Sequence, residues 1–315
     1  MSHLADAQLI DIHAHFRPKG WKVDPPYRPI SFPAELQATL TDLPALASDS
    51  ARSGVSLRAL SAPVEQLFGP EGDIPSHLIH ATNYYLAEVV RKHPGAFLGL
   101  ATVDAFSGEA GAEQTRYAIE ELGLHGIVLD SSRNDRYLSS PEVYPTLELA
   151  AELRVPVFVH PVAANEAELF TSAAGRNGNS LGRGLQNGIS FLSALHAELP
   201  TRLPDLQLVF TALGNGALYF AADALADYRA EHGFSPNLFF DTTRFNPALI
   251  RYYSEVLGVD RIIVGTDWPG RDTSREHTDK TLTAAGLDQE QQELVRVGNA
   301  RRLFELRTSP VLTHA

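Results

Sequence analysis

The chain has 315 residues, of which 44% are hydrophobic, and a formal net charge of -12. This composition suits one large or two small globular domains, and the acidic balance argues against a nucleic-acid or anionic-membrane surface. Because cysteine is absent, disulfides, thiolate metal ligands and a cysteine nucleophile are excluded. No apolar run reaches the roughly 18 residues of a membrane span, and residues 1–8 do not resemble a signal peptide. We therefore expect a cytoplasmic protein that acts on a small molecule.

Short apolar segments alternate with helical segments along the whole chain. The expected strands cover residues 9–16, 55–63, 96–103, 126–130, 155–162, 206–213, 238–243 and 261–267. The expected helices cover residues 34–53, 75–93, 111–122, 141–153, 189–199, 217–232, 247–257, 275–285 and 289–304. Continuously apolar strands are typical of parallel strands buried on both faces. The pattern predicts one TIM-barrel domain over residues 1–315. A doubly wound sheet is the alternative, although no Gly-x-Gly-x-x-Gly follows the first strand.

Two long connections follow expected strands. Residues 17–54 begin with several prolines, together with Trp21 and Tyr27, and long loops of this kind often line sites. We predict a lid or pocket wall there, with a plain surface excursion as the alternative. Residues 163–188 are rich in Gly, Asn and Ser, which predicts a flexible loop after the fifth strand.

The first strand ends in His13 and His15, which are two residues apart. Side chains at this spacing point to the same side of a strand. In a TIM barrel the site lies at the carboxyl ends of the strands, where the fifth strand ends in His160 and the eighth in Asp267. Three imidazoles and a carboxylate suit one divalent ion, with Zn²⁺ as the first candidate. An open coordination position would hold a water with a lowered pKa.

Three separated motifs are similar to those of one protein family. Residues 11–18 (Asp-Ile-His-Ala-His-Phe-Arg-Pro) resemble the opening signature of the amidohydrolase superfamily. The similarity is to the amidohydrolase-2 branch, which includes aminocarboxymuconate-semialdehyde decarboxylase and the resorcylate-type decarboxylases. Residues 159–161 (Val-His-Pro) and 265–269 (Gly-Thr-Asp-Trp-Pro) resemble that branch's motifs on the fifth and eighth strands. The resemblance spans residues 9–305 and implies a TIM barrel with one metal ion, usually zinc. The implied ligands are His13, His15, His160 and Asp267.

The chain departs from the family pattern after the sixth strand. Ala212 stands where the family has a histidine that serves in acid–base chemistry, and alanine cannot transfer a proton. Another base could come from Asp130, Asp241 or His277, although a structural role is the favoured alternative for each. Binuclear members of the superfamily carry a lysine where this chain has Asp130, so the resemblance implies a single metal ion.

Four further residues are candidates for substrate contact. Arg244 or Arg17 could bind an anionic group through two hydrogen bonds, with an ordinary salt bridge as the alternative for Arg244. Trp268 could stack on a planar substrate or pack beneath the metal-binding loop. Asn215 could donate to an oxyanion or be a simple turn residue in Gly-Asn-Gly.

The resemblance supplies the leading hypothesis for the reaction. It implies a metal-dependent carboxy-lyase that decarboxylates a planar aromatic or unsaturated acid, with Asp267 and Arg244 as catalytic residues. A second hypothesis is hydrolysis of an amide or lactone bond by metal-bound hydroxide. A third is a binding protein on the same scaffold, because the histidine is replaced by Ala212. A homodimer is implied by the family alone.

Overall fold

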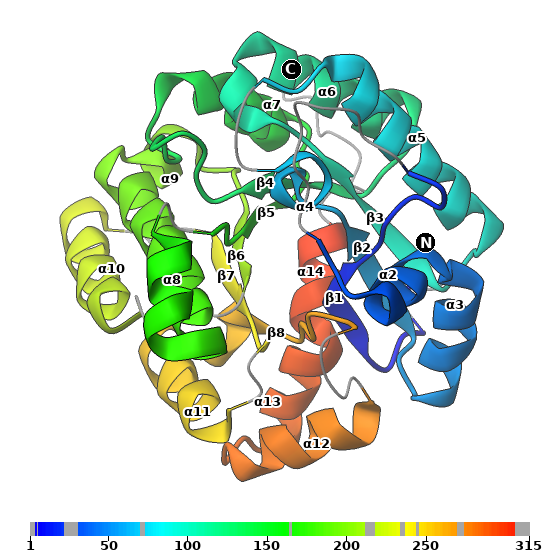
Figure 1. Ribbon diagram of the computed structural model, residues 1–315. Coiled ribbons are helices and arrows are strands. Elements are labelled where there is room, and N and C mark those ends of the chain that lie inside the picture. Colours follow the sequence, from blue (N-terminus) through cyan, green and yellow to red (C-terminus); the bar gives the residue numbers. More distant parts are fainter. Residues whose placement is uncertain are drawn as a thin grey trace, which may run out of the picture.

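The computed structural model describes residues 4, 6–21, 31–69, 73–163, 166–211, 218–233, 237–243, 246–269 and 274–305. Its centre is a ring of eight strands surrounded by helices (Figure 1). The strands are β1 (Ile10–His15), β2 (Leu57–Ser61), β3 (Phe97–Thr102), β4 (Gly126–Asp130), β5 (Val157–His160), β6 (Leu208–Phe210), β7 (Leu238–Asp241) and β8 (Ile262–Ile263). All eight predicted strands are thereby confirmed; β4 has the predicted bounds and the other seven are shorter.

The strands pair in sequence order, and every pair from β1·β2 to β7·β8 is parallel. The ring closes between β1 and the segment after β8. There the Ile12 amide donates to the Val264 carbonyl (2.9 Å), and Ala14 forms a parallel bridge with Trp268. Closure leaves no sheet edge exposed, and the predicted (β/α)8 TIM barrel is confirmed.

The helices lie mainly around the outside of the barrel, as Figure 1 shows. They are α2 (Ala34–Thr41), α3 (Leu43–Arg52), α4 (Val64–Phe68), α5 (Ser76–Lys92), α6 (Glu109–Arg116), α7 (Tyr144–Glu152), α8 (Ala167–His196), α9 (Leu199–Arg202), α10 (Leu218–His232), α11 (Pro247–Val256), α12 (Arg275–Ala284), α13 (Gln289–Glu293) and α14 (Asn299–Glu305). In the described part of the chain, no helix combines the length and the apolar character needed to cross a membrane.

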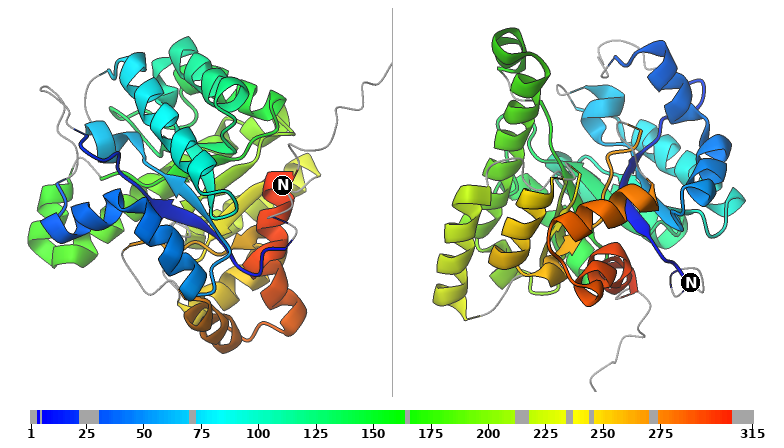
Figure 2. Two further views of the ribbon diagram at one scale, coloured as in Figure 1. Left: turned by 90° about the vertical axis from the view of Figure 1, so that its right-hand side faces the viewer. Right: turned by 90° about the horizontal axis from the view of Figure 1, so that it is seen from below.

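The barrel interior changes from apolar to polar along the strands. Ile10, Leu98, Val128, Phe158 and Phe239 belong to one buried cluster inside the barrel, and α14 contributes to its amino-terminal end. Alternate residues of a strand face the same side, so the next inward positions form a buried polar layer at the carboxyl end. This layer comprises Ser61, Thr102, Asp130, His160, Thr211 and Asp241. In the right-hand view of Figure 2, α14 (red) and the N-terminus lie toward the lower end of the molecule, whereas the first half of α8 (green) lies at the upper end.

One prediction about the connections is wrong. Most of segment 163–188 is not a flexible loop but part of α8, which bends at Ala174 and Gly175. Gly175 has φ +58°, and a Cβ at Gly178 would lie 1.9 Å from the Phe170 carbonyl oxygen, so glycine permits both the bend and the close approach after it. Tertiary packing here outweighs the poor helix propensity of glycine.

Residues 34–53, expected to be helical at least in part, form two helices. Asp42 separates α2 from α3 with non-helical dihedral angles, and its side chain accepts from the Ala45 amide. Asp42 is therefore the N-cap of α3, with Pro44 in the first turn, where proline needs no hydrogen-bond donor.

Candidate metal centre

A bulge in β1 places both histidines of the strand at the barrel mouth. Three steps along β1, from Asp11 to Ala14, pair with only two steps along β2. Ile12 belongs to the interior cluster, whereas Ala14 packs outside the barrel against the helices. The extra residue shifts the alternation of the strand, so the inward Ile12 is followed by His13 and His15, which also face inward.

His13, His15 and His160 converge at this mouth. Their ring centroids lie 4.9, 5.4 and 5.0 Å apart, and each pair of rings is nearly perpendicular. One ligand atom from each ring lies within 4.8 Å of the others, and the two Nε2 atoms of His13 and His15 are 3.2 Å apart. Two nitrogens bound at about 2.0–2.1 Å to one tetrahedral ion lie about 3.3 Å apart. The spacing therefore fits a shared metal ion.

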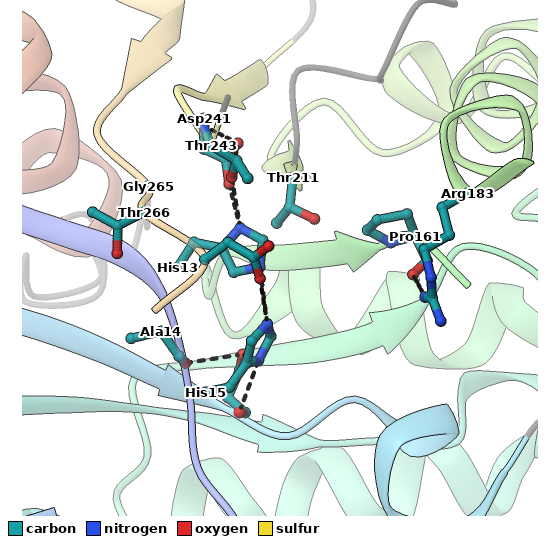
Figure 3. A network of polar contacts seen from close by, with 12 residues as sticks. His13, Ala14, His15, Pro161, Arg183, Thr211, Asp241, Thr243, Gly265 and Thr266 are labelled. Carbon is teal, nitrogen blue, oxygen red and sulfur yellow. Dashed lines mark hydrogen bonds and ion pairs between the residues drawn. The ribbon is translucent and has the colours of Figure 1, made fainter. Parts of the chain in front are cut away.

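The outer nitrogen of His13 is held by β7. Nδ1 lies 2.6 Å from Asp241 Oδ2 and 3.0 Å from Thr243 Oγ1, as Figure 3 shows. A carboxylate only accepts, so Nδ1 donates to Asp241 and Nε2 faces the cluster. Burial opposes the charged ring, but the Asp241 carboxylate and then Asp267 outweigh it and raise the pKa of His13 to about 9. The charged ring carries a second proton, on Nε2, and a metal ion that binds Nε2 must displace that proton.

His15 is oriented by β2 and contacts Asp267. Its Nδ1 lies 3.3 Å from the Ser61 carbonyl oxygen, so Nε2 points to the cluster. Asp267 Oδ1 lies 3.1 Å from Nε2 of His15 and 3.7 Å from Nε2 of His13. The Asp267 backbone has φ +58° and its amide donates to the His13 carbonyl (2.9 Å). With 46% of its side chain exposed, Asp267 lies at the open side of the cluster.

His160 differs from the other two histidines because its Nδ1 is buried and has no hydrogen-bond partner in the part of the chain that the structure describes. A buried polar atom without a partner costs about 1–3 kcal/mol. Burial, followed by the neighbouring His15 and His13, lowers the pKa of His160. A neutral ring is the form that binds metals. The orphaned nitrogen and the converging rings fit a bound divalent ion.

The structure locates two of the four candidate substrate-binding residues. Arg17 is buried, and its guanidinium donates to Gln37 Oε1 (2.8 Å) and the Gln66 carbonyl (2.6 Å). Trp268 is 8% exposed and packs in the apolar cluster, which is the second of its two sequence interpretations. Arg244 and Asn215 lie outside the described residues, as does Ala212.

The alternative acid–base candidates have distinct environments. Asp241 orients His13, as described above. Asp130 accepts from the Glu65 amide (3.0 Å), and burial followed by repulsion from Glu65 raises its pKa to about 8. At neutral pH, Asp130 is therefore mostly protonated. His277 lies in the first turn of α12, where its backbone amide donates to Ser274 Oγ (3.1 Å).

Sequence reasoning missed the role of Asp11 and Arg58. Both side chains are fully buried and form an ion pair between β1 and β2. Asp11 also accepts from the His13 amide (3.1 Å) and from the amide and hydroxyl of Thr266 (3.0 and 2.7 Å). The pair therefore joins the strand that carries His13 to the segment that carries Asp267. The available signal was an Asp inside a buried strand, which demands a partner.

Fold and site together define a (β/α)8-barrel protein with a three-histidine, one-aspartate cluster at the carboxyl end of its strands. A family model described as Amidohydrolase (Amidohydro_2) matches residues 10–306. The chain belongs to this amidohydrolase family, and the resemblance inferred from the three sequence motifs is confirmed.

Relatives with assigned activities are decarboxylases. Gamma-resorcylate decarboxylase of Polaromonas sp. (strain JS666 / ATCC BAA-500) is 23% identical over 279 residues, covering 79% of this chain and 82% of the relative. The 2-amino-3-carboxymuconate-6-semialdehyde decarboxylase of Dictyostelium discoideum is 26% identical over 243 residues, covering 69% of this chain and 64% of the relative.

A solved structure supports the same fold. The dihydroxybenzoic acid decarboxylase from Polaromonas sp. JS666, with bound manganese and the inhibitor 2-nitroresorcinol, superimposes with a TM-score of 0.78 at 20% identity. The match covers 98% of this chain and 99% of that chain.

Proposed function

We propose that His13, His15, His160 and Asp267 bind one divalent metal ion. The orphaned Nδ1 of His160 and the 3.2 Å separation of the Nε2 atoms of His13 and His15 support this assignment. Zinc accepts such a nitrogen and oxygen ligand set, and so does manganese, the ion bound in the Polaromonas structure. Elemental analysis of the purified protein distinguishes the two ions, and the ratio of metal to chain tests the proposal of a single ion.

We infer that the reaction is decarboxylation of a planar aromatic carboxylic acid. The observation that carries this inference is the His3–Asp cluster at the barrel mouth of a chain whose relatives are decarboxylases. When bound, the ion supplies a Lewis-acid site for the substrate carboxylate and a neighbouring oxygen. Asp241 and Ser61 hold His13 and His15 in place through their Nδ1 atoms.

The step requires one proton at the ring carbon. The bond from this carbon to the carboxyl group breaks, its electron pair stays on the carbon, and carbon dioxide leaves. A proton then joins the carbon, so atoms and charge balance. Asp267 lies on the open side of the cluster and is proposed to pass this proton, because Ala212 cannot. Arg244 is proposed to hold an anionic group of the substrate.

Metal removal and product analysis test this function. We expect a chelator to abolish release of carbon dioxide from 2,6-dihydroxybenzoate or 5-carboxyvanillate, and added Zn²⁺ or Mn²⁺ to restore it. In D2O, the product should carry one deuterium at the former carboxyl position, as measured by NMR. Formation of a new carboxylate from amide or lactone substrates would favour the hydrolase. No turnover by metal-loaded protein on either substrate panel would refute both enzyme hypotheses.

We expect Asp241→Asn to weaken metal binding. The substitution removes the charge that holds Nδ1 of His13, and losing such an outer partner typically costs about 10–100-fold in metal affinity. Competition with a chromophoric chelator measures the dissociation constant. Thr243→Val, which removes the longer 3.0 Å contact to the same nitrogen, is the matched control and should have a smaller effect. Equal affinities for all three proteins would contradict the role of Asp241.

A further inference from the structure

An ion pair between α4 and α8 lies beside the metal cluster. Glu65 and Arg183 are 118 residues apart in sequence, and their side chains meet through two contacts. Arg183 Nη1 donates to Oε2 (2.9 Å) and Nη2 donates to Oε1 (3.2 Å). Glu65 is 2% exposed, so its charge is shielded from water and depends on these partners.

Both members of the pair also bind the turn that follows His160. Arg183 Nη1 donates to the carbonyl of Pro161 (2.7 Å), the residue directly after His160, as Figure 3 shows. Glu65 Oε1 accepts from the amide of Ala163 (2.8 Å). The pair therefore holds the turn at two points, one and three residues beyond the histidine.

The two elements that carry the pair are themselves fixed to neighbouring strand ends. The Glu65 amide donates to Asp130, which pairs in register with His160 on the adjacent strand. On α8, Gln186 accepts from Ser132 Oγ (2.9 Å) beyond β4. The next residue of α8, Asn187, donates to the Thr211 carbonyl (2.7 Å) beyond β6. The pair is consequently anchored on both sides of β5.

The three histidines are oriented in different ways. Nδ1 of His13 donates to Asp241 and Nδ1 of His15 to a backbone carbonyl, whereas Nδ1 of His160 has no hydrogen-bond partner among the described residues and is left as the candidate ligand atom. A ligand ring must still be held in its orientation by its surroundings. We propose that the Glu65–Arg183 pair positions His160 through its backbone, by holding the turn that follows it at Pro161 and Ala163. The inference rests on the proposed function in so far as His160 is a metal ligand.

Arginine suits this position because one planar guanidinium contacts a carboxylate and a carbonyl at once. Lysine offers a point charge on a flexible chain and cannot reproduce the fork. Arg183→Lys should therefore retain part of the function, and Arg183→Met should lose it. Glu65→Gln keeps the shape of the side chain but removes the charge. Because the two residues act as one unit, the double variant with Glu65→Gln and Arg183→Met should bind Mn²⁺ no more weakly than Arg183→Met alone.

Titration of the full chain with Mn²⁺ alone, followed by EPR, tests the proposal. We expect Glu65→Gln and Arg183→Met to weaken Mn²⁺ binding by about 10–100-fold, with Arg183→Lys intermediate. Arg296→Lys is the matched control, because Arg296 is similarly buried and also donates from both terminal nitrogens, in its case to Asp279 (2.8 Å) and Glu293 (2.7 Å). Its affinity should equal that of the wild type. Folded variants that bind Mn²⁺ as tightly as the wild type would overturn the proposal.

A second measurement, on metal-free protein, separates this inference from the proposed function. The imidazole ¹⁵N signals of His160, assigned with His160→Gln, should shift or broaden in Glu65→Gln and Arg183→Lys but not in Arg296→Lys. Unchanged signals overturn the positioning role. If the wild type binds no metal but the signals shift, the proposed function fails and the positioning role stands. Circular dichroism identifies variants that do not fold. If Glu65→Gln does not fold, Arg183→Lys, which is the mildest of the changes, carries the test.

Discussion

His160→Ala should remove the bound metal and the decarboxylase activity together. The substitution deletes a buried nitrogen that has no hydrogen-bond partner among the described residues. Structural zinc sites gain about 10–16 kcal/mol from a full ligand set. One ligand of four then contributes about 2.5–4 kcal/mol, or about 70- to 900-fold in affinity. Elemental analysis and release of carbon dioxide, measured on the same preparation, check both parts of the expectation.

A histidine outside the cluster provides the control for this experiment. His77 is exposed on α5, so His77→Ala should leave metal content and activity unchanged. Far-UV circular dichroism establishes that both variants are folded. Retention of one metal ion per chain in folded His160→Ala, with normal turnover, would remove His160 from the ligand set.

Arg58→Met should be the most destabilising single change considered in this chain. Arg58 and Asp11 are both fully buried, so the substitution leaves the Asp11 carboxylate without its counter-ion in the protein interior. Breaking a buried pair in this way typically costs about 3–5 kcal/mol. Urea denaturation at neutral pH measures the loss as a change in the free energy of unfolding. Metal affinity should fall as well, because Asp11 binds the His13 amide and Thr266.

An exposed ion pair on the neighbouring helix gives the comparison. Arg52 and Asp49 lie on α3 with side chains 73% and 49% exposed and a separation of 3.4 Å. Surface pairs contribute about 0–1 kcal/mol, so Arg52→Met should change the free energy of unfolding very little. If Arg58→Met and Arg52→Met lower the free energy of unfolding equally, the buried Asp11–Arg58 pair does not stabilise the fold more than a surface pair does.

The sequence predicted the barrel well because its information is local. Most strands are short runs rich in apolar residues, and β4 has the predicted bounds of residues 126–130. The helices were harder to predict where tertiary packing, and not local propensity, determines the structure. In α8, buried glycines at 178, 182 and 184 have low helix propensity and predicted a loop, but Gly178 allows a close contact with Phe170 that only the folded chain reveals.

The site shows the same division between local and non-local information. The convergence of His13, His15 and His160 followed from the ends of predicted strands, and the structure brings the three rings together. The contacts around the three histidines could not be predicted, because they join residues that are distant in sequence. Asp241 lies 228 residues from His13, and in the neighbouring ion pair Arg183 lies 118 residues from Glu65. Residues 212, 215 and 244 lie outside the described part of the chain, so Asn215 and Arg244 stay predictions. The homodimer and the cytoplasmic location stay predictions as well.

The bulge in β1 has a consequence for transferring this site to another scaffold. On a regular strand, a motif with inward histidines at positions 13 and 15 turns residue 12 outward, so the barrel loses Ile12 from its interior. Keeping Ile12 inside would instead turn both imidazoles toward the surrounding helices. The extra residue between Asp11 and Ala14 allows one strand to fill the barrel and present both rings. A graft therefore needs the staggered pairing of β1 with β2, and copying the His-x-His letters alone would not suffice.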